Sequence, residues 1–387
     1  MADLYVPYVS GVTTYINLTK RSLEKLGHEV FVFTFGNGRF PGDEPNVIRS
    51  PGLPIKRGEI YMNGFYNLPT NKLLRTMDIL HVNHPFFSGF VAISSNYAGL
   101  QPIVFTNHTR YDSYTRLYLK GFFFVIGNTF LKSYFSHFYQ RMDAVIIPSK
   151  SMEKIIWQYR PLQALYTVPH GMELDPFYRT GIAKDRAEFG FQPDDVLFVY
   201  VGRLWPEKNL PFLIESFARI CQRYDNARLL LVGGGPERRK ITHQVTEAGI
   251  GTKVHFTGAI DHSQLPQYYQ AADIFISPSI TETFGLTVIE AMASGLPVIG
   301  IDSVGISDTV KDEVTGLLTM NDMDDFTKAM GRMLVNRDLR QEMGKNALRE
   351  SSKYRIESSV EQLLEVYQQA IRSRKEKHIE GKITIPS

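Results

Sequence analysis

Alternation of short apolar runs with helical patterns constrains the fold of this chain more than any other feature. In the second half, five apolar runs are each followed by a polar loop or a glycine, and they cover residues 196–201, 229–232, 254–256, 274–276 and 297–301. An amphipathic helical pattern over residues 210–223 separates the first two runs. Nearly continuous apolar strands joined by helices are typical of a parallel sheet covered on both faces. Ligands of such sheets bind beyond the carboxyl ends of the strands.

The first half repeats this pattern less regularly. A helix is predicted over residues 13–26, and strands over 27–34, 79–82, 103–106 and 144–147. A chain of 387 residues is long enough for two domains of ordinary size. We therefore expect two α/β domains, residues 1–180 and 181–355, followed by a helix and a frayed tail over residues 356–387.

Composition narrows the class of protein. Hydrophobic residues make up 43% and charged residues 21%, as in a globular protein. Cys221 is the only cysteine, which excludes an intramolecular disulfide and fits a reducing compartment. We expect no secretory leader, and the apolar run at residues 122–126 is too short to span a membrane. Residues 1–180 hold 18 basic and 12 acidic residues, a balance that suits an anionic surface but also fits ordinary scatter of charge.

Two carboxylates mark the most informative segment, residues 281–300. Glu282 stands just before a predicted apolar helix, and Glu290 lies about one turn inside it. The free N–H groups of a helix N-terminus attract anionic oxygens. Carboxylates beside such a site accept hydrogen bonds from sugar hydroxyls. Together they indicate a pocket for a polyol carrying a diphosphate, which is a nucleotide sugar.

Two cations follow the first strand of the second half. Arg203 and Lys208 lie on a loop that Pro206 stiffens, where they would donate charge-assisted hydrogen bonds to a diphosphate. Solvated surface cations are the alternative, and the two carboxylates favour the binding role. The glycines of residues 233–235 indicate either close approach of a nucleotide or a plain turn.

Three features of the first half carry weaker signals. Residues 9–14, with Gly11, indicate either a phosphate-binding loop or a helix capped by Ser or Thr. His108 follows a predicted strand, where it is either a cleft residue or a structural histidine. Residues 117–141 are dense in aromatic and basic side chains, which favours a membrane-facing segment slightly over a core helix.

With these motifs in place, the chain resembles the retaining glycosyltransferases of family 4, which have the GT-B fold of two doubly wound, Rossmann-like domains facing a cleft. The resemblance covers nearly the whole chain and is most specific over residues 272–300. It implies an acceptor-binding first domain, a nucleotide-sugar-binding second domain, and a C-terminal helix that returns to the first. The motifs that carry it are Ser10-Gly11-Val12, Gly27-His28-Glu29-Val30, His108-Thr109, residues 168–173, Gly202-Arg203, Glu207-Lys208-Asn209, Gly233, Gly235-Pro236, Gly258, Ala272-Asp273, Pro278-Ser279, Glu282-Thr283-Phe284-Gly285 and Glu290-Ala291.

The resemblance also implies roles for individual residues. Arg203 and Lys208 would bind the diphosphate, Glu290 the ribose hydroxyls, and Glu282 the sugar hydroxyls, while His108 would lie beside the transferred sugar. We take His108, Arg203, Lys208 and Glu282 as the catalytic set. The expected donor site comprises Gly11, Gly202, Arg203, Lys208, Gly258, Glu282, Thr283, Phe284, Gly285, Leu286, Thr287 and Glu290. No metal or permanent cofactor is expected, because the cations and a helix N-terminus would stabilise the departing diphosphate.

The acceptor is the open part of this reading. The aromatic and basic stretch resembles that of family members that glycosylate membrane lipids, such as glycosyldiacylglycerol synthases and phosphatidylinositol mannosyltransferases. We therefore expect transfer of a hexose, with retention, from UDP-glucose or GDP-mannose to a lipid at the inner face of the membrane. Nucleic acid is not an expected partner. The residues assigned to the acceptor or the membrane are Arg110, Tyr111, Lys120, Phe122, Phe123, Phe124 and Lys132.

Two alternatives stay open, and two departures from the family pattern stand out. The alternatives are a soluble sugar or small-metabolite acceptor, and a GT-B phosphorylase, epimerase or non-catalytic binder. Ser10 stands where many members carry the first glycine of a pair. Members also open with a full apolar strand, whereas only residues 1–7 precede the loop here. We expect the first strand to be clipped, through a shortened chain or a misassigned start.

Overall fold

The computed structural model describes residues 1–8, 10–40, 42–55, 60–63, 65–96, 101–112, 121–161, 164–178 and 183–379. The chain divides into two compact units. Unit 1 comprises Met1–Met172 and Ile356–Ser387, and unit 2 comprises Glu173–Arg355. The division after Met172 comes earlier than the boundary at residue 180 expected from the sequence.

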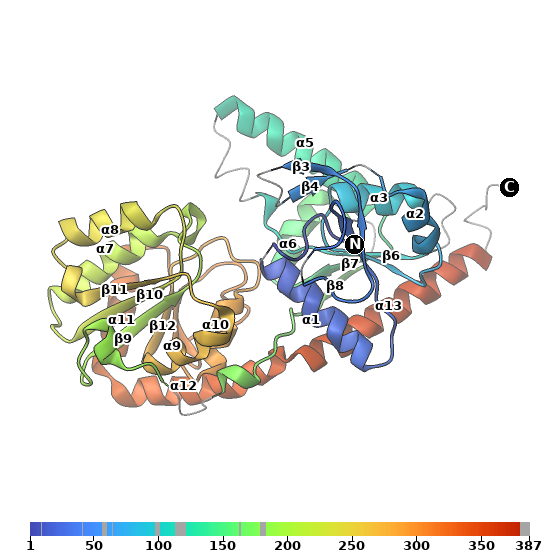
Figure 1. Ribbon diagram of the computed structural model, residues 1–387. Coiled ribbons are helices and arrows are strands. Elements are labelled where there is room, and N and C mark those ends of the chain that lie inside the picture. The colour runs from blue at the N-terminus through green and yellow to red at the C-terminus, as the bar shows by residue number, and fades with distance from the viewer. Residues whose placement is uncertain are drawn as a thin grey trace. The chain divides into compact units, whose positions relative to one another are not determined.

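Unit 2 is a six-stranded parallel sheet with helices around it (Figure 1). The strand order is β11-β10-β9-β12-β13-β14. The strands are β9 (Val196–Val201), β10 (Ala227–Val232), β11 (Val254–Gly258), β12 (Ile274–Ser277), β13 (Val298–Ile301) and β14 (Gly316–Thr319). The helices are α7 (Leu210–Cys221), α8 (Arg238–Glu247), α9 (Leu265–Ala271), α10 (Leu286–Ala293), α11 (Met323–Val335) and α12 (Arg337–Ser351). Short 3₁₀ turns are η3 (Asp175–Phe177), η4 (Arg186–Phe189), η5 (Pro206–Lys208), η6 (Gly251–Lys253), η7 (His262–Gln264) and η8 (Ser352–Tyr354).

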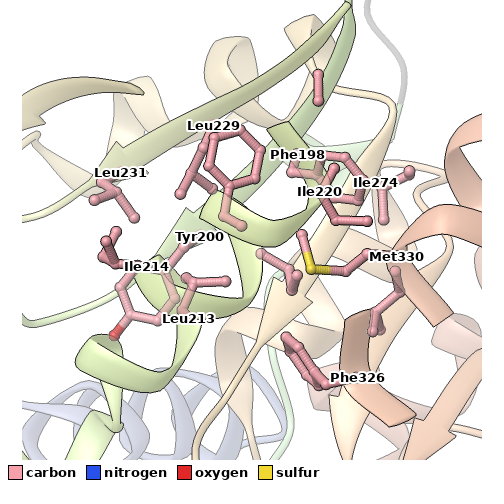
Figure 2. Close-up of a cluster of buried hydrophobic side chains, with 14 of the residues drawn as sticks. Phe198, Tyr200, Leu213, Ile214, Ile220, Leu229, Leu231, Ile274, Phe326 and Met330 are labelled. Carbon is pink, nitrogen blue, oxygen red and sulfur yellow. The ribbon is translucent and has the colours of Figure 1, made fainter. Parts of the chain in front are cut away.

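The core of unit 2 lies between this sheet and the helices α7 and α11. Figure 2 shows Phe198 of β9 and Leu229 of β10 packed over Ile220 of α7, with Phe326 and Met330 of α11 beside them. Every residue of β9 is buried, as expected of a central strand in a parallel sheet. This rigid sheet fixes where the loops after β9, β10 and β11 begin.

Unit 1 contains two parallel sheets and a hairpin. Strands β1 (Val32–Phe35) and β2 (Val47–Ser50) form one sheet, and β5 (Leu80–Val82), β6 (Ile103–Thr106), β7 (Ala144–Ile147) and β8 (Leu165–Thr167) form the other. The hairpin pairs β3 (Leu53–Ile55) with β4 (Ile60–Met62). The helices are α1 (Gly11–Lys25), α2 (Leu68–Leu74), α3 (Phe87–Ser95), α5 (Gly121–Tyr139), α6 (Met152–Ile156) with the turn η2 (Trp157–Tyr159), and α13 (Ile356–Ile379).

Residues 1 and 2 lie between β1 and β5. The N–H of Ala2 donates to Phe33 O at 3.0 Å, and Met1 O accepts from the N–H of Asn83 at 2.9 Å. The N-terminal amine donates to His81 O, and burial lowers its pKa to about 5. A cavity of about 1000 Å³, lined by residues of α1, β1, β5 and α13, adjoins this short bridge. Residues 1 and 2, where a clipped strand is expected, therefore connect β1 and β5 through backbone hydrogen bonds beside a cavity.

Helix α13 completes the packing of unit 1 and lies alongside α1 (Figure 1). Its start is fastened to the segment after β8, because the N–H of Ile356 donates to Met172 O and Ser359 Oγ donates to Pro169 O. A Cβ at Gly171 would lie 2.6 Å from Ile356 Cα, so only glycine fits this crossing. No helix among the described residues combines the length and apolarity needed to cross a bilayer.

Candidate active site

Three glycines close the carboxyl ends of β9, β10 and β11. The N–H of Gly202 donates to Val232 O, and the N–H of Gly233 donates to Gly258 O. A Cβ at Gly233 would lie only 1.9 Å from Gly202 O. The glycines therefore let neighbouring loops pack backbone against backbone. Close packing of the turn accounts for Gly233 and Gly235, and the approach of a nucleotide to this loop stays a prediction.

Arg203 and Lys208 both follow β9 but differ in exposure. The Arg203 side chain is 54% exposed, lies over the Trp205 ring and contacts Glu207 at 3.3 Å. Lys208 ends the turn η5, and its side chain is 18% exposed. Asn209 adopts a left-handed conformation and donates to Pro278 O, which ties this loop to the segment after β12. The structure thus fixes Lys208 more firmly than Arg203.

Lys208 and Glu282 form an ion pair. Lys208 Nζ lies 2.5 Å from Glu282 Oε1. Burial opposes ionisation of Glu282, but the charge and hydrogen bond of Lys208 outweigh it and hold the pKa of Glu282 below its usual value. The structure therefore brings together two members of the predicted catalytic set.

The loop from Thr283 to Gly285 leads into α10. Gly285 caps the helix with a positive φ of 73°, a backbone conformation that only glycine adopts readily. A Cβ at Gly305 would lie 2.6 Å from Phe284 N. Glycine at position 305 therefore allows this loop to pack closely against the segment that contains Gly305. Phe284 is buried, and its carbonyl accepts from Thr309 Oγ1. Leu286 and Thr287 form the first turn of α10, which begins where a donor anion is predicted to bind.

Glu290 lies in the second turn of α10 and is buried. Its Oε2 accepts from Tyr269 Oη at 2.7 Å, and its Oε1 is 2.8 Å from His262 Nε2. The hydrogen bond to Glu290 raises the pKa of His262. Neither Tyr269 nor His262 is among the predicted site residues, because one of two adjacent tyrosines in α9 and a histidine in a polar loop carry no periodic signal.

His108 of unit 1 is buried and bonded through both ring nitrogens. Its Nε2 is 2.8 Å from Asn83 Oδ1, and its Nδ1 is 3.0 Å from His170 Nε2. With the Asn83 oxygen as acceptor, His108 carries its proton on Nε2 and accepts from His170. Burial lowers the pKa of His108 well below its ordinary value. The imidazole is therefore neutral and firmly oriented, as either reading of the sequence allows.

The start of α1 is capped by Ser10, as one of the two readings of this segment predicts. The N–H of Thr13 donates to Ser10 Oγ at 3.2 Å, and the N–H of Ser10 donates to Thr13 Oγ1 at 2.8 Å, which is a capping box. Gly11 is exposed at the first helical position. Its contact with a donor diphosphate stays a prediction.

The residues assigned to the acceptor are only partly described. Lys120 and the side chains of Phe122, Phe123 and Phe124 lie outside the described residues. Arg110 pairs with Asp112 at 2.7 Å, whereas Lys132 is exposed on α5.

Tyr111 and the second half of α5 belong to an aromatic cluster. The Tyr111 ring contacts Phe86 and Phe135. Phe135, Phe138 and Tyr139 are buried. The slight preference for a membrane-facing segment over residues 117–141 is therefore wrong for these three side chains, which face the core because they pack on β6 and one another.

Comparison with known proteins identifies the family. The model for "Glycosyl transferases group 1" matches residues 181–350, and the model for "Glycosyltransferase Family 4" matches residues 9–176. An alpha-monoglucosyldiacylglycerol synthase of Streptococcus pneumoniae is 31% identical over 83% of this chain and 75% of that protein. The chain belongs to glycosyltransferase family 4.

Further relatives of this glycosyltransferase agree in family and fold. The synthase of the same description from Acholeplasma laidlawii is 27% identical over 89% of this chain and 90% of its own length. Sucrose-phosphate synthase of Thermosynechococcus elongatus superposes with a TM-score of 0.74 at 25% identity, covering 94% of both chains. HepE of Anabaena, solved with UDP, gives a TM-score of 0.75 at 18% identity, over 95% of this chain and 100% of that one. The fold is GT-B, as the resemblance implied.

Proposed function

We propose that this glycosyltransferase transfers a hexose, with retention, from a nucleotide diphosphate sugar to a membrane lipid. UDP-glucose and GDP-mannose are the candidate donors. One observation supports the proposed donor. Lys208, Glu282 and the start of α10 lie together at the carboxyl ends of β9 and β12. This is the edge at which parallel sheets bind their ligands.

In the proposed donor complex, Lys208 and Arg203 would face the diphosphate. Lys208 is already neutralised by Glu282, so a donor would draw its ammonium toward the phosphates while Glu282 turns to the sugar hydroxyls. A charge-assisted hydrogen bond to phosphate would replace the one to carboxylate. Arg203 is more exposed and would complete the contact. No metal is proposed, because these two cations and the α10 N-terminus would stabilise the leaving diphosphate.

The proposed reaction exchanges one bond at the anomeric carbon for another. The bond from that carbon to the diphosphate oxygen breaks, and the electron pair leaves with the nucleotide diphosphate. The acceptor hydroxyl attacks from the same face, and its proton passes to the departing phosphate oxygen. His108, held neutral by burial, is proposed to lie beside the transferred sugar, the role that the resemblance implies.

A lipid acceptor is favoured by the relatives and by an apolar surface of unit 1. Two relatives named as alpha-monoglucosyldiacylglycerol synthases match most of the chain. Helix α5 exposes Phe130 by 67%, and α3 exposes Phe90 by 58%. The Tyr134 ring stacks on both Phe130 and Phe86, and so links α5 to the residue that precedes α3. We place the membrane contact at this aromatic surface, and propose that the exposed Lys132 of α5 meets anionic headgroups at the inner face of the membrane.

A donor and acceptor screen tests the proposal. Release of nucleotide diphosphate is measured from UDP-glucose and GDP-mannose, with diacylglycerol vesicles or with soluble sugars as acceptor. Release that increases with the vesicles supports the lipid acceptor. Release that increases only with a soluble sugar supports a soluble acceptor, the alternative that the buried second half of α5 favours. Turnover that requires inorganic phosphate would identify a phosphorylase and contradict the proposal.

A further inference from the structure

The carboxylate of Glu290 is held from two sides within unit 2. Tyr269 of α9 is fully buried, and its hydroxyl donates to Glu290 Oε2 and lies 3.3 Å from Thr287 O. His262, at the start of η7, reaches Glu290 Oε1 from the solvent side, with its own side chain 62% exposed. One oxygen of Glu290 therefore has a fixed inner partner and the other an outer partner.

A second set of contacts holds the two partners. The Phe177 ring of η3 meets His262 edge-on at 5.5 Å between centroids and Tyr269 at 5.8 Å. The backbone of Glu290 is also fixed, since its carbonyl accepts from Ser294 Oγ. A carboxylate held in this way cannot rotate freely, but each of its oxygens can accept more than one hydrogen bond. Hydroxyl groups of a ligand can thus add to the protein donors without displacing both.

We infer that Tyr269 and His262 are positioning residues that set the selectivity of this site for ribose over deoxyribose, by fixing Glu290 to accept from a ribose hydroxyl. The inference rests on the proposed donor site, in which Glu290 binds the nucleotide. A site built to hydrogen-bond a hydroxyl rejects the analogue that lacks it, because the polar group of the site is then left without that partner. Rejection of this kind needs an oriented carboxylate, which is what the two donors provide.

Charges around His262 favour its role. Glu290 on α10 and Glu173, in the segment before η3, both raise its pKa, while partial burial opposes them, and Asp261 is its neighbour in the chain. The imidazole therefore donates to Glu290 in its neutral form and binds more strongly when protonated. Tyr269 remains a neutral donor, because burial raises the pKa of its hydroxyl well above the ordinary value.

The test compares UDP with 2′-deoxy-UDP, and GDP with 2′-deoxy-GDP, by calorimetry on the full chain. The native protein is expected to prefer the ribonucleotide about 10- to 100-fold, the range for a hydrogen bond to a charged group. Tyr269→Phe and His262→Ala are each expected to reduce that preference at least about 5-fold, as the carboxylate loses a fixed donor. His262→Gln retains an N–H donor and should preserve most of the preference. His243→Ala is the matched control, since His243 forms an exposed pair with Glu247 on α8.

Each outcome is decisive. A loss of ribose preference in Tyr269→Phe and His262→Ala, with little loss of affinity for the deoxynucleotide, supports the inference. Equal weakening of both nucleotides would assign the two residues a merely structural role and overturn it. A native protein that binds nucleotides without ribose preference also overturns it while leaving the donor site intact. A native protein that binds none of the four nucleotides contradicts the proposed function itself.

Discussion

Lys208 and Glu282 form an ion pair across 74 positions of sequence, with Nζ and Oε1 2.5 Å apart. The pair joins the loop after β9 to the loop before α10. It therefore holds the residue predicted to bind the diphosphate next to the residue predicted to bind the sugar. In the proposed donor complex the ammonium would move from Glu282 to the diphosphate. The pair therefore keeps the charge in place before the donor arrives, which limits the reorganisation needed for reaction.

Removing the cation tests this role. Lys208→Ala is expected to lower kcat at least about 100-fold, the scale for losing one preorganised donor at a developing charge. The measurement is steady-state release of nucleotide diphosphate. Lys240→Ala is the matched control, because Lys240 forms an exposed pair with Glu237. Near-normal turnover in Lys208→Ala would remove the assigned role.

Glu290→Ala is expected to act mainly on binding of the donor. The carboxylate is proposed to contact the ribose, which does not change during reaction, so its loss should raise the donor Kd about 10-fold or more and lower kcat less. Calorimetry with the donor nucleotide measures the first effect. An unchanged Kd would contradict the ribose assignment.

The contribution of the Lys208–Glu282 pair to folding stability should decrease at acid pH. The pKa of Glu282 is lower in the folded protein than its ordinary value of 4.5. The pair therefore stabilises the fold above about pH 4.5, and this contribution is lost as the pH falls through the folded pKa. The difference in Tm between the native protein and Glu282→Gln should shrink below about pH 4.5. A difference that stays constant down to about pH 3 would exclude ionisation of Glu282 as its source.

Buried histidines of unit 1 predict a second pH effect. Burial lowers the pKa of His170 and His81 to about 3 and of His84 to about 4, from an ordinary value of 6.5. The unfolded chain takes up these protons first, so stability falls as the pH drops from about 6.5 toward 4. His170→Gln keeps an N–H for His108 and removes one titrating group. Its unfolding free energy should change less steeply with pH, by up to about 1.4 kcal/mol per pH unit.

The measurement is chemical denaturation at a series of pH values, with His243→Gln as the control for an exposed histidine. Equal slopes for the native protein and His170→Gln would show that His170 does not keep its lowered pKa.

Membrane contact depends on the surface of α3 and α5. Phe130→Asp and Phe90→Asp are expected to weaken flotation with anionic vesicles at low salt, because each places a charge on an exposed aromatic surface. Val335→Asp, at an exposed apolar position at the end of α11 in unit 2, is the control. Flotation that all three variants retain would exclude this surface as the contact.

Much of the fold follows from the sequence because the parallel strands are buried on both faces. Residues 196–201 and 103–105 read as continuous apolar runs, and both lie in strands with every residue buried. Strand β14 was not predicted, since Gly316–Thr319 is short and is made a strand by pairing with β13. Burial of Phe135 and Tyr139 was also missed, because an aromatic run in a helix reads the same whether it faces lipid or core.

The candidate site divides in the same way. Arg203, Lys208, Glu282 and Glu290 could be proposed from the sequence because charged residues interrupt apolar patterns there, and their roles as donor ligands stay predictions. The ion pair of Lys208 and the contacts of His262 and Tyr269 with Glu290 could not be predicted, because they depend on which loops the sheet order brings together. Asp273 is a motif residue whose contacts are structural. Its carboxylate accepts hydrogen bonds from Leu197 N and from Arg186, at the start of β9.

Product analysis tests the central claim most directly. The purified protein is incubated with UDP-glucose or GDP-mannose and diacylglycerol vesicles, and the lipid fraction is examined by mass spectrometry and proton NMR. We predict a lipid heavier by one hexose and linked through the α-anomer, which is the configuration of both donors. A β-linked product would contradict retention, and the absence of hexose from the lipid, while a soluble sugar is glycosylated, would contradict the lipid acceptor.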